Sequence, residues 1–248
     1  MKNKFLQIKL IFILLTTLLY SCNKEKAFDC VKTTGKTSEK IIETEAFHSI
    51  LLNDNIDLII HQGPLTEVIL KGGKNILPKI KCYVKDGILH IYNENSCNWV
   101  RKFENPKVLV TISDLKTLYH EGYGEVQSEG KLNFKDFSIQ NSTGNGDITL
   151  DLDVENLVIF SHSSSLITLK GKATNLNLVY LYNYGRFHSQ DLATNNISIS
   201  HQGLNTFKVF PLQSMDIYIG HSGNVEYYNE PENMQSQFSS KGKLIKMF

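Results

Sequence analysis

The feature that most constrains this chain is a repeat of about 20 residues that begins near residue 115. Each unit holds two short alternating apolar stretches, separated by a polar corner that often contains glycine. The second stretches are anchored by Val126, Ile148, Ile167, Phe187, Phe207, Val225 and Leu244, with spacings of 22, 19, 20, 20, 18 and 19 residues. The first stretches are anchored eight or nine residues earlier, by Leu118, Ile139, Ile159, Leu178, Ile199 and Ile217. Such a repeat of short strands predicts a β-solenoid, in which each coil buries its inward face against the next.

The alternation of apolar residues extends to the rest of the domain, without the i, i+3, i+4 spacing of an amphipathic helix. We therefore expect an all-β protein. A β-sandwich is the alternative, but it explains the strands and turns without explaining the constant phase of the repeat. Glycines in the corners, such as Gly122, Gly124, Gly144 and Gly146, are expected to supply the positive φ of tight turns.

An Asp86-Gly87 pair between two alternating stretches predicts an N-terminal β-hairpin. A two-residue turn pairs Val84 with Leu89 and Cys82 with Ile91. The inward face of this hairpin then holds Ile80, Cys82, Val84, Leu89 and Ile91. Cys82 is accordingly expected to behave as a small buried hydrophobic residue.

The first 21 residues have the features of a secretory signal peptide. Three lysines are followed by an apolar run of 11 residues from Leu10 to Tyr20. This run is too short to cross a bilayer, which requires about 20 residues. The sequence Leu19-Tyr20-Ser21-Cys22 resembles a bacterial lipobox, so we expect cleavage before Cys22, lipid attachment to it and anchoring to a membrane.

The mature chain divides into a tether and one domain. Residues 22–46 are polar and rich in Lys, Thr and Glu, and we expect them to be a spacer. Residues 47–248 are expected to form the solenoid domain. Without residues 1–21, the chain has 23 Lys and Arg against 25 Asp and Glu. This balance argues against nucleic-acid binding, which requires a strongly basic face.

Three cysteines follow the lipobox. Because secretion leads to an oxidising compartment, we expect a disulfide between Cys30 and Cys97, and three free thiols are the alternative. Neither Cys-x-x-Cys nor His-x-x-x-His spacing occurs, so the sequence identifies no definite metal site and no cofactor.

Weaker candidates for a cation site are carboxylates and imidazoles. Asp151, Asp153 and Glu155 alternate along one strand and could offer hard oxygens to Ca²⁺. His201 and His221 fall at neighbouring corners and could offer imidazoles to a transition metal. The alternatives are a solvated strand face for the carboxylates and hydrogen bonding to corner backbone groups for the histidines.

A row of tyrosines offers a second type of site. Tyr180, Tyr182 and Tyr184 alternate, so they share one face of a strand. Exposed, this row could stack on sugar rings or anchor a protein partner. The alternative is packing inside the coil, because both parities of this segment are apolar.

Several short stretches, in this order, resemble the auto-transporter adhesin, head GIN domain family of Bacteroidetes lipoproteins. They are Phe47–Ile56, Asn75–Ile80, Gly87–Ile91, Asn95–Arg101 and Gly220–Val225, within a similarity that covers about residues 47–245. The resemblance implies a right-handed β-helix-like fold, an envelope location, adhesion and no catalytic residues.

Together these observations predict a non-enzymatic outer-membrane lipoprotein of the cell envelope that binds a polysaccharide or an envelope protein. The sequence does not distinguish the periplasmic side of that membrane from the cell surface. One alternative is a glycan-active enzyme, lyase or hydrolase, which requires convergent carboxylates in a groove. Another is a structural spacer or assembly subunit, which exposed apolar patches at a face or end of the solenoid would favour.

Overall fold

The computed structural model describes residues 33–96, 104–181 and 184–248. Within them the chain forms one sheet of 16 strands and a single short 3-10 helix. The N-terminal elements are β1 (Thr37–Ile42), β2 (Ser49–Leu52), β3 (Asp57–Gln62), β4 (Glu67–Gly73), η1 (Leu77–Lys79), β5 (Ile80–Lys85), β6 (Ile88–Asn93), β7 (Lys107–Ile112) and β8 (Thr117–His120). The coil elements are β9 (Val126–Asn141), β10 (Ile148–Ser161), β11 (Leu166–Tyr180), β12 (Arg186–His201), β13 (Phe207–Ile219), β14 (Val225–Tyr227), β15 (Asn233–Phe238) and β16 (Leu244–Lys246).

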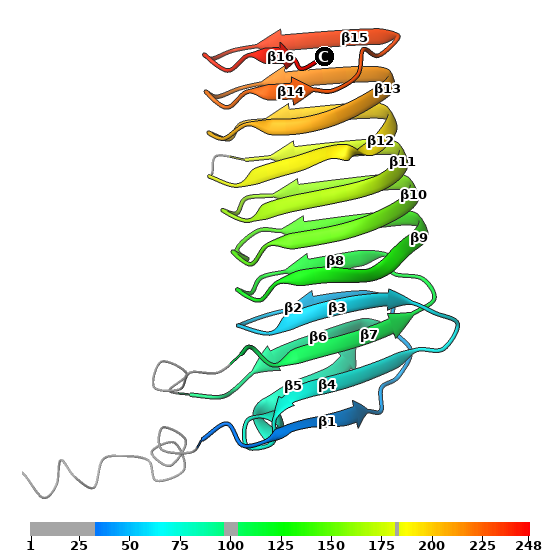
Figure 1. Ribbon diagram of the computed structural model, residues 1–248, viewed down its shortest axis with the longest axis vertical. Helices are drawn as coiled ribbons and strands as arrows, with labels where there is room; N and C mark the ends of the chain where they lie inside the picture. The colour runs from blue at the N-terminus through cyan, green and yellow to red at the C-terminus, as the bar shows by residue number, and fades with distance from the viewer. Residues whose placement is uncertain (1–32, 97–103, 182–183) are drawn as a thin grey trace, which may run out of the picture.

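The coils from β9 to β16 stack along the long axis of the molecule, which confirms the all-β solenoid (Figure 1). Each long strand joins the second stretch of one unit to the first stretch of the next, and the polar corners separate the strands. Neighbouring coils pair in parallel. Every predicted anchor lies beside its counterpart on the next coil, as in the pairs Ile148–Ile167, Phe187–Phe207 and Ile159–Leu178.

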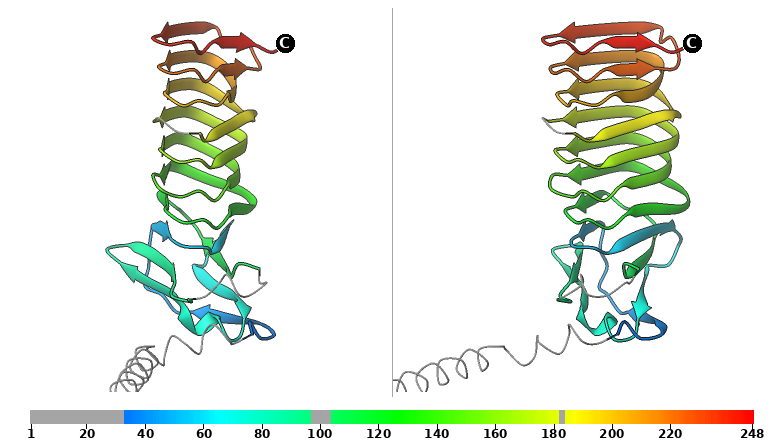
Figure 2. Two further views of the ribbon diagram at one scale, coloured as in Figure 1. Left: turned by 90° about the vertical axis from the view of Figure 1, so that its left-hand side faces the viewer. Right: turned by 60° about the vertical axis from the view of Figure 1, so that its left-hand side comes forward.

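The same columns of inward residues continue into the N-terminal strands. Leu58 pairs with Val126 on one side and with Val108 on the other. The short strand β2 extends the opposite column, because its Ile50 pairs with Leu118. All of these side chains are buried, so one hydrophobic core runs through the described domain. The two views of Figure 2 show that the regular coils stack directly on the less regular N-terminal strands.

The N-terminal strands include the predicted hairpin. β5 and β6 pair antiparallel in the expected register, with Val84 beside Leu89 and Cys82 beside Ile91. Asp86 and Gly87 have φ values of 53° and 73°, as a two-residue hairpin turn with two positive φ angles requires. Cys82 is partly buried against the core, and burial raises the pKa of its thiol to about 12.

Part of residues 22–46, which the sequence analysis expected to be a spacer, is structured. Strand β1 lies inside that range and pairs antiparallel with β4 over six residues. Ile42 at the end of β1 packs partly against the core, but Ile41 is 64% exposed, so this edge strand is held mainly by its backbone hydrogen bonds to β4. A strand of this kind lacks the apolar pattern by which sequence analysis detects strands.

The corner glycines serve a different purpose from the one expected. Positive φ occurs at Gly130 and Gly171, within long strands, whereas Gly124 and Gly146 are not among the described glycines with positive φ. A Cβ atom on Gly124 would collide with the carbonyl oxygen of Ile56, and one on Gly146 with the carbonyl oxygen of Gly124. These glycines therefore allow neighbouring corners to stack closely.

The inward columns predict a large cost for truncating a central side chain. Phe207 is fully buried and packs against Tyr180, Phe187 and His201. We expect Phe207→Ala to lower the free energy of unfolding by about 3–5 kcal/mol, measured by urea denaturation. Leu212→Ala on the same strand, where the side chain is 37% exposed, is the control and should cost less than about 1 kcal/mol. Equal losses in the two variants would contradict this packing.

Candidate binding surface

One column of inward residues, next to the polar corners, is itself polar. It contains Tyr180, the first residue of the expected tyrosine row. Tyr180 is fully buried, its hydroxyl donates to the carbonyl oxygen of Ser163, and its ring meets Phe207 edge to face. The prediction of an exposed row is therefore wrong at this residue, because Tyr180 shares the inward parity of Leu178. Tyr184 is 67% exposed, and Tyr182 lies outside the described residues.

The same column contains two buried histidines, one of them a predicted metal ligand. His201 lies beside Tyr180 in the sheet register, and its Nε2 is 2.9 Å from the carbonyl oxygen of Asn205. His120 makes the equivalent 3.0 Å contact with the carbonyl oxygen of Gly124. Each imidazole thus satisfies a backbone group across its own corner, which favours the structural alternative for the histidines.

Burial controls the charge of these two imidazoles. Desolvation lowers the pKa of His120 and of His201 to about 4, although a hydrogen bond to a backbone carbonyl opposes the shift in both. His221, which is less buried, adds a smaller lowering effect on the pKa of His201. Neutral imidazoles inside the coil act as hydrogen-bonding core residues.

The acidic strand is paired with lysines on the next coil. Asp151 and Asp153 lie directly beside Lys170 and Lys172, with N–O distances of 3.4 and 3.0 Å. These surface ion pairs use the carboxylates that were candidate Ca²⁺ ligands, and Glu155 is exposed beyond them. Across residues 33–96, 104–181 and 184–248, no group of three or more His, Cys, Asp or Glu side chains could hold a metal ion.

Two further predicted sites fall outside the described residues. Cys22, the expected lipidation site, lies there, and so do Cys30 and Cys97 of the expected disulfide. Within the described part of the chain, Cys82 is a free thiol.

The structure reveals an aromatic cluster that the sequence analysis did not identify. Tyr83 and His90 face each other across the β5–β6 hairpin, with ring centroids 5.0 Å apart and ring planes 1° apart. Tyr92 lies 6.3 Å from Tyr83 and 6.1 Å from His90, at 14° to both. We call these three residues the aromatic triad. Because its members alternate with the inward residues of the hairpin, the triad lies on the outer face.

The outer face continues from the triad toward the coils as a row across the strands. His90 lies beside Leu51 of β2, which lies beside Tyr119 of β8, which lies beside Gln140 of β9. These side chains are all partly exposed, and Tyr83 at the start of the row is 48% exposed. With neighbouring strands about 4.8 Å apart, the row from Tyr83 to Gln140 spans roughly 19 Å.

A ladder of polar side chains, three of them asparagines, forms a second regular feature on the bend of the long strands. Its residues are Asp136, Asn156, Asn175, Asn196 and Ser214, joined by side-chain hydrogen bonds of 2.7, 2.8, 3.0 and 2.8 Å. A shallow groove of about 350 Å³ runs beside the ladder. The hydrogen bonds run along the ladder itself, so we interpret it as a support for the bend.

Both features have a signal in the sequence. The ladder residues each precede a first-stretch anchor by three positions, as Asn156 precedes Ile159. The predicted hairpin register placed Tyr83, His90 and Tyr92 on the outward parity. The stacking of their rings depends on side-chain rotamers, which the alternation pattern does not specify.

Taken together, the structure is a β-solenoid with a packed interior, and its N-terminal hairpin carries a cluster of stacked, partly exposed aromatic groups. The family model described as "Putative auto-transporter adhesin, head GIN domain" matches residues 46–231. The chain therefore belongs to this family, as the resemblance of its short motifs indicated. No curated protein matches the chain.

Solved structures share the fold. A putative adhesin from Bacteroides fragilis superposes with a TM-score of 0.77 at 22% identity, over 86% of this chain and 97% of that one. A putative lipid binding protein from Parabacteroides distasonis gives 0.67 at 18%, over 86% and 98%. A putative adhesin from Parabacteroides merdae gives 0.61 at 18%, over 87% and 98%. At these identities the similarity shows the fold alone.

Membership of an adhesin family indicates a location in the cell envelope or at the cell surface. Among the residues that the structure describes, no helix is long and apolar enough to cross a membrane.

The buried histidines predict that the protein loses stability in acid. An unfolded histidine binds a proton near pH 6.5, whereas His120 and His201 in the folded protein do so only near pH 4. Between these values the unfolded chain binds more protons, so the free energy of unfolding falls as the pH falls, by roughly 3 kcal/mol per histidine. Urea midpoints at pH 7 and pH 4.5 measure this loss. His201→Gln should make the free energy of unfolding depend less steeply on pH. A pH dependence as steep as that of the wild type would contradict the lowered pKa of His201 as a cause of the loss.

Proposed function

We propose that this protein is a non-enzymatic lipoprotein of the cell envelope that adheres to a polysaccharide through the row that begins at the aromatic triad. The observation that carries the proposal is the near-parallel arrangement of the Tyr83, His90 and Tyr92 rings on an outer sheet face. Such aromatic groups are costly to leave partly in water, and they concentrate where proteins contact partners.

The chemistry of the triad suits a sugar. An aromatic ring offers an apolar face to the C–H groups of a pyranose, and a tyrosine hydroxyl can donate to its hydroxyls. Desolvation, Tyr83 and the nearby carboxylates of Glu121 and Asp54 raise the pKa of Tyr92, so its phenol keeps its proton. The ion pair of Lys81 with Glu94, at 3.6 Å, borders the triad and supplies polar groups at its edge.

The shape of the surface favours a polymer. The row from Tyr83 through His90, Leu51 and Tyr119 to Gln140 crosses five strands, and each of its side chains is at least partly exposed. A small molecule is normally held in a concave pocket that buries most of its surface. An extended row of partly exposed groups instead allows several consecutive sugar units to contact the protein.

An enzymatic role has less support from the described residues. Glycoside hydrolysis uses two carboxyl groups, one as acid and one as nucleophile or base. Asp151 and Asp153, two of the three acidic residues considered as cation ligands, are each paired with a lysine on the adjacent coil. The family description and the names of two structural relatives also refer to adhesion.

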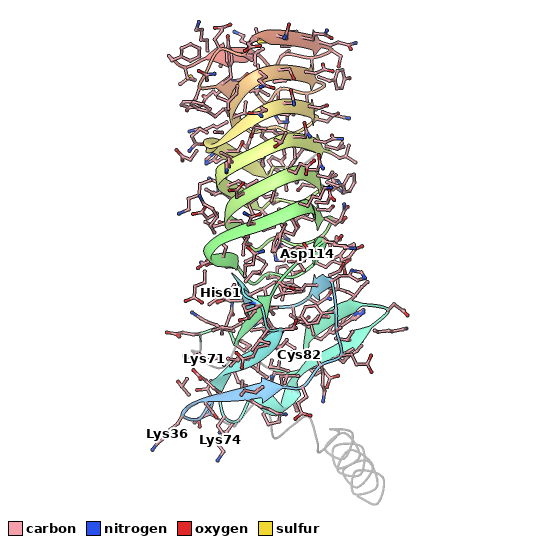
Figure 3. All side chains as sticks on the ribbon, turned by 90° about the vertical axis from the view of Figure 1, so that its right-hand side faces the viewer. Lys36, His61, Lys71, Lys74, Cys82 and Asp114 are labelled. Atoms are coloured by element: carbon pink, nitrogen blue, oxygen red, sulfur yellow. The ribbon has the colours of Figure 1, made fainter. Side chains whose placement is uncertain are left out.

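The proposed anchor is a lipid on Cys22 in the outer membrane. About ten residues separate Cys22 from the described domain, enough to span up to roughly 35 Å when extended. Lys36 and Lys74 lie at the end of the molecule where the chain enters the domain (Figure 3), and Lys71 in the same region is paired with Glu39 at 2.7 Å. Basic residues at this end favour its orientation toward anionic lipid head groups.

Removal of the triad tests the proposed binding surface. A glycan array first identifies a polysaccharide bound by the purified protein, and titration then gives its dissociation constant. We expect Tyr83→Ala and Tyr92→Ala each to weaken binding at least about fivefold, since each loses a stacking contact worth about 1 kcal/mol.

The matched control is Tyr184→Ala, which removes a tyrosine that is 67% exposed at a distant corner. We expect this variant to bind as the wild type does. Undiminished binding in both triad variants would exclude the triad as the site. If the protein binds none of the glycans on the array, the polysaccharide proposal is overturned.

A further inference from the structure

The C-terminal end of the solenoid exposes positions that are buried elsewhere. Strand β15 belongs to the last coil and, within the described residues, pairs with β13 alone. Its Met234 and Phe238 continue the columns of Met215 and Ile219. Met215 and Ile219 are 1% and 0% exposed, whereas Met234 and Phe238 are 42% and 46% exposed. The last coil therefore presents part of an unfinished core.

The free edge of β15 has backbone groups available for pairing. The N–H of Ser239 donates to the carbonyl of Ile219, so by alternation the odd-numbered residues of β15 face β13. The N–H and C=O groups of Met234, Ser236 and Phe238 consequently point to the open side. Exposed edges are usually protected by charges, proline or bulges, but the β15 sequence Asn-Met-Gln-Ser-Gln-Phe has no charged residue and no proline.

We propose that a second copy of this chain covers this end, with the two β15 strands paired antiparallel about a twofold axis at Ser236. In this register Ser236 faces its own counterpart, and Met234 faces Phe238 of the second copy. The N–H and C=O groups of these residues point toward the open edge, and their side chains point toward the core side. One register therefore pairs the backbone groups and also brings the apolar side chains into contact.

Charge complementarity favours the second copy over an unrelated strand. Glu232 precedes β15 and Lys241 follows it, and both are exposed. Antiparallel pairing about Ser236 brings Glu232 of one copy toward the bend at residues 239–241 of the other, which contains Lys241. The two opposite-charge contacts are created only when the strands run antiparallel, which also suppresses parallel stacking.

The dimer would extend the proposed adhesive role. Strand β1, near the expected tether, lies at the opposite end of the molecule from β15 (Figure 1). A dimer joined through the C-terminal ends carries its two anchors far apart at opposite ends. If the lipid anchor is correct, the contact therefore links copies on facing surfaces. The dimer itself does not depend on the anchor or on polysaccharide binding.

Sedimentation velocity of the purified protein, from micromolar to millimolar concentration, tests the proposal. We expect a monomer–dimer equilibrium. Ser236→Pro removes an N–H that does not bond to β13, and proline is tolerated at such edge positions, so the coil should form while the dissociation constant rises at least about tenfold. Ser236→Ala is the control and should dimerise as the wild type does.

Charge reversal provides a second test that leaves the β15 strand itself unchanged. Glu232→Lys and Lys241→Glu should each weaken the dimer, and the double variant should restore it. A wild-type protein that stays monomeric at every concentration would overturn the proposal. So would a dimer that Ser236→Pro leaves intact, or charge-reversed single variants that the double variant fails to rescue.

Discussion

The structure depends on the stacking of like positions on consecutive coils. A single coil covers its own inward residues only in part, so its apolar residues become fully buried only when the neighbouring coils are in register. Parallel backbone pairing fixes that register and places Phe187 against Phe207 and Ile148 against Ile167. The columns pass without a break through Leu58 into the N-terminal strands, so the hairpins and the solenoid share one core.

This arrangement determines where function can reside. The interior is filled by packed side chains, including hydrogen-bonded polar residues such as His201 and Tyr180. Recognition is therefore left to the outer faces and the two ends. The outer faces of the coils carry hydrogen-bonded or ion-paired ladders, whereas the hairpin β5–β6 carries the aromatic triad, and the C-terminal end has an unpaired edge.

The sequence predicted the coil register because large apolar residues recur there at a nearly constant spacing. It predicted the hairpin because Asp86 and Gly87 tolerate the backbone angles that the turn requires. It failed where side-chain patterns carry little information. Strand β1 is held by backbone pairing, Tyr180 lies in a segment that is apolar on both parities, and the corner glycines are required by close stacking between coils. Ring stacking in the triad depends on rotamers.

The central claim is that binding occurs on the hairpin face while the coils serve as a scaffold. Hydrogen–deuterium exchange of the protein, with and without a polysaccharide that it binds, tests this claim most directly. We predict that the polysaccharide slows exchange in residues 80–93 and at the adjoining strands β2 and β8. Protection confined to the coils β9–β13, with the hairpin unchanged, would contradict the account.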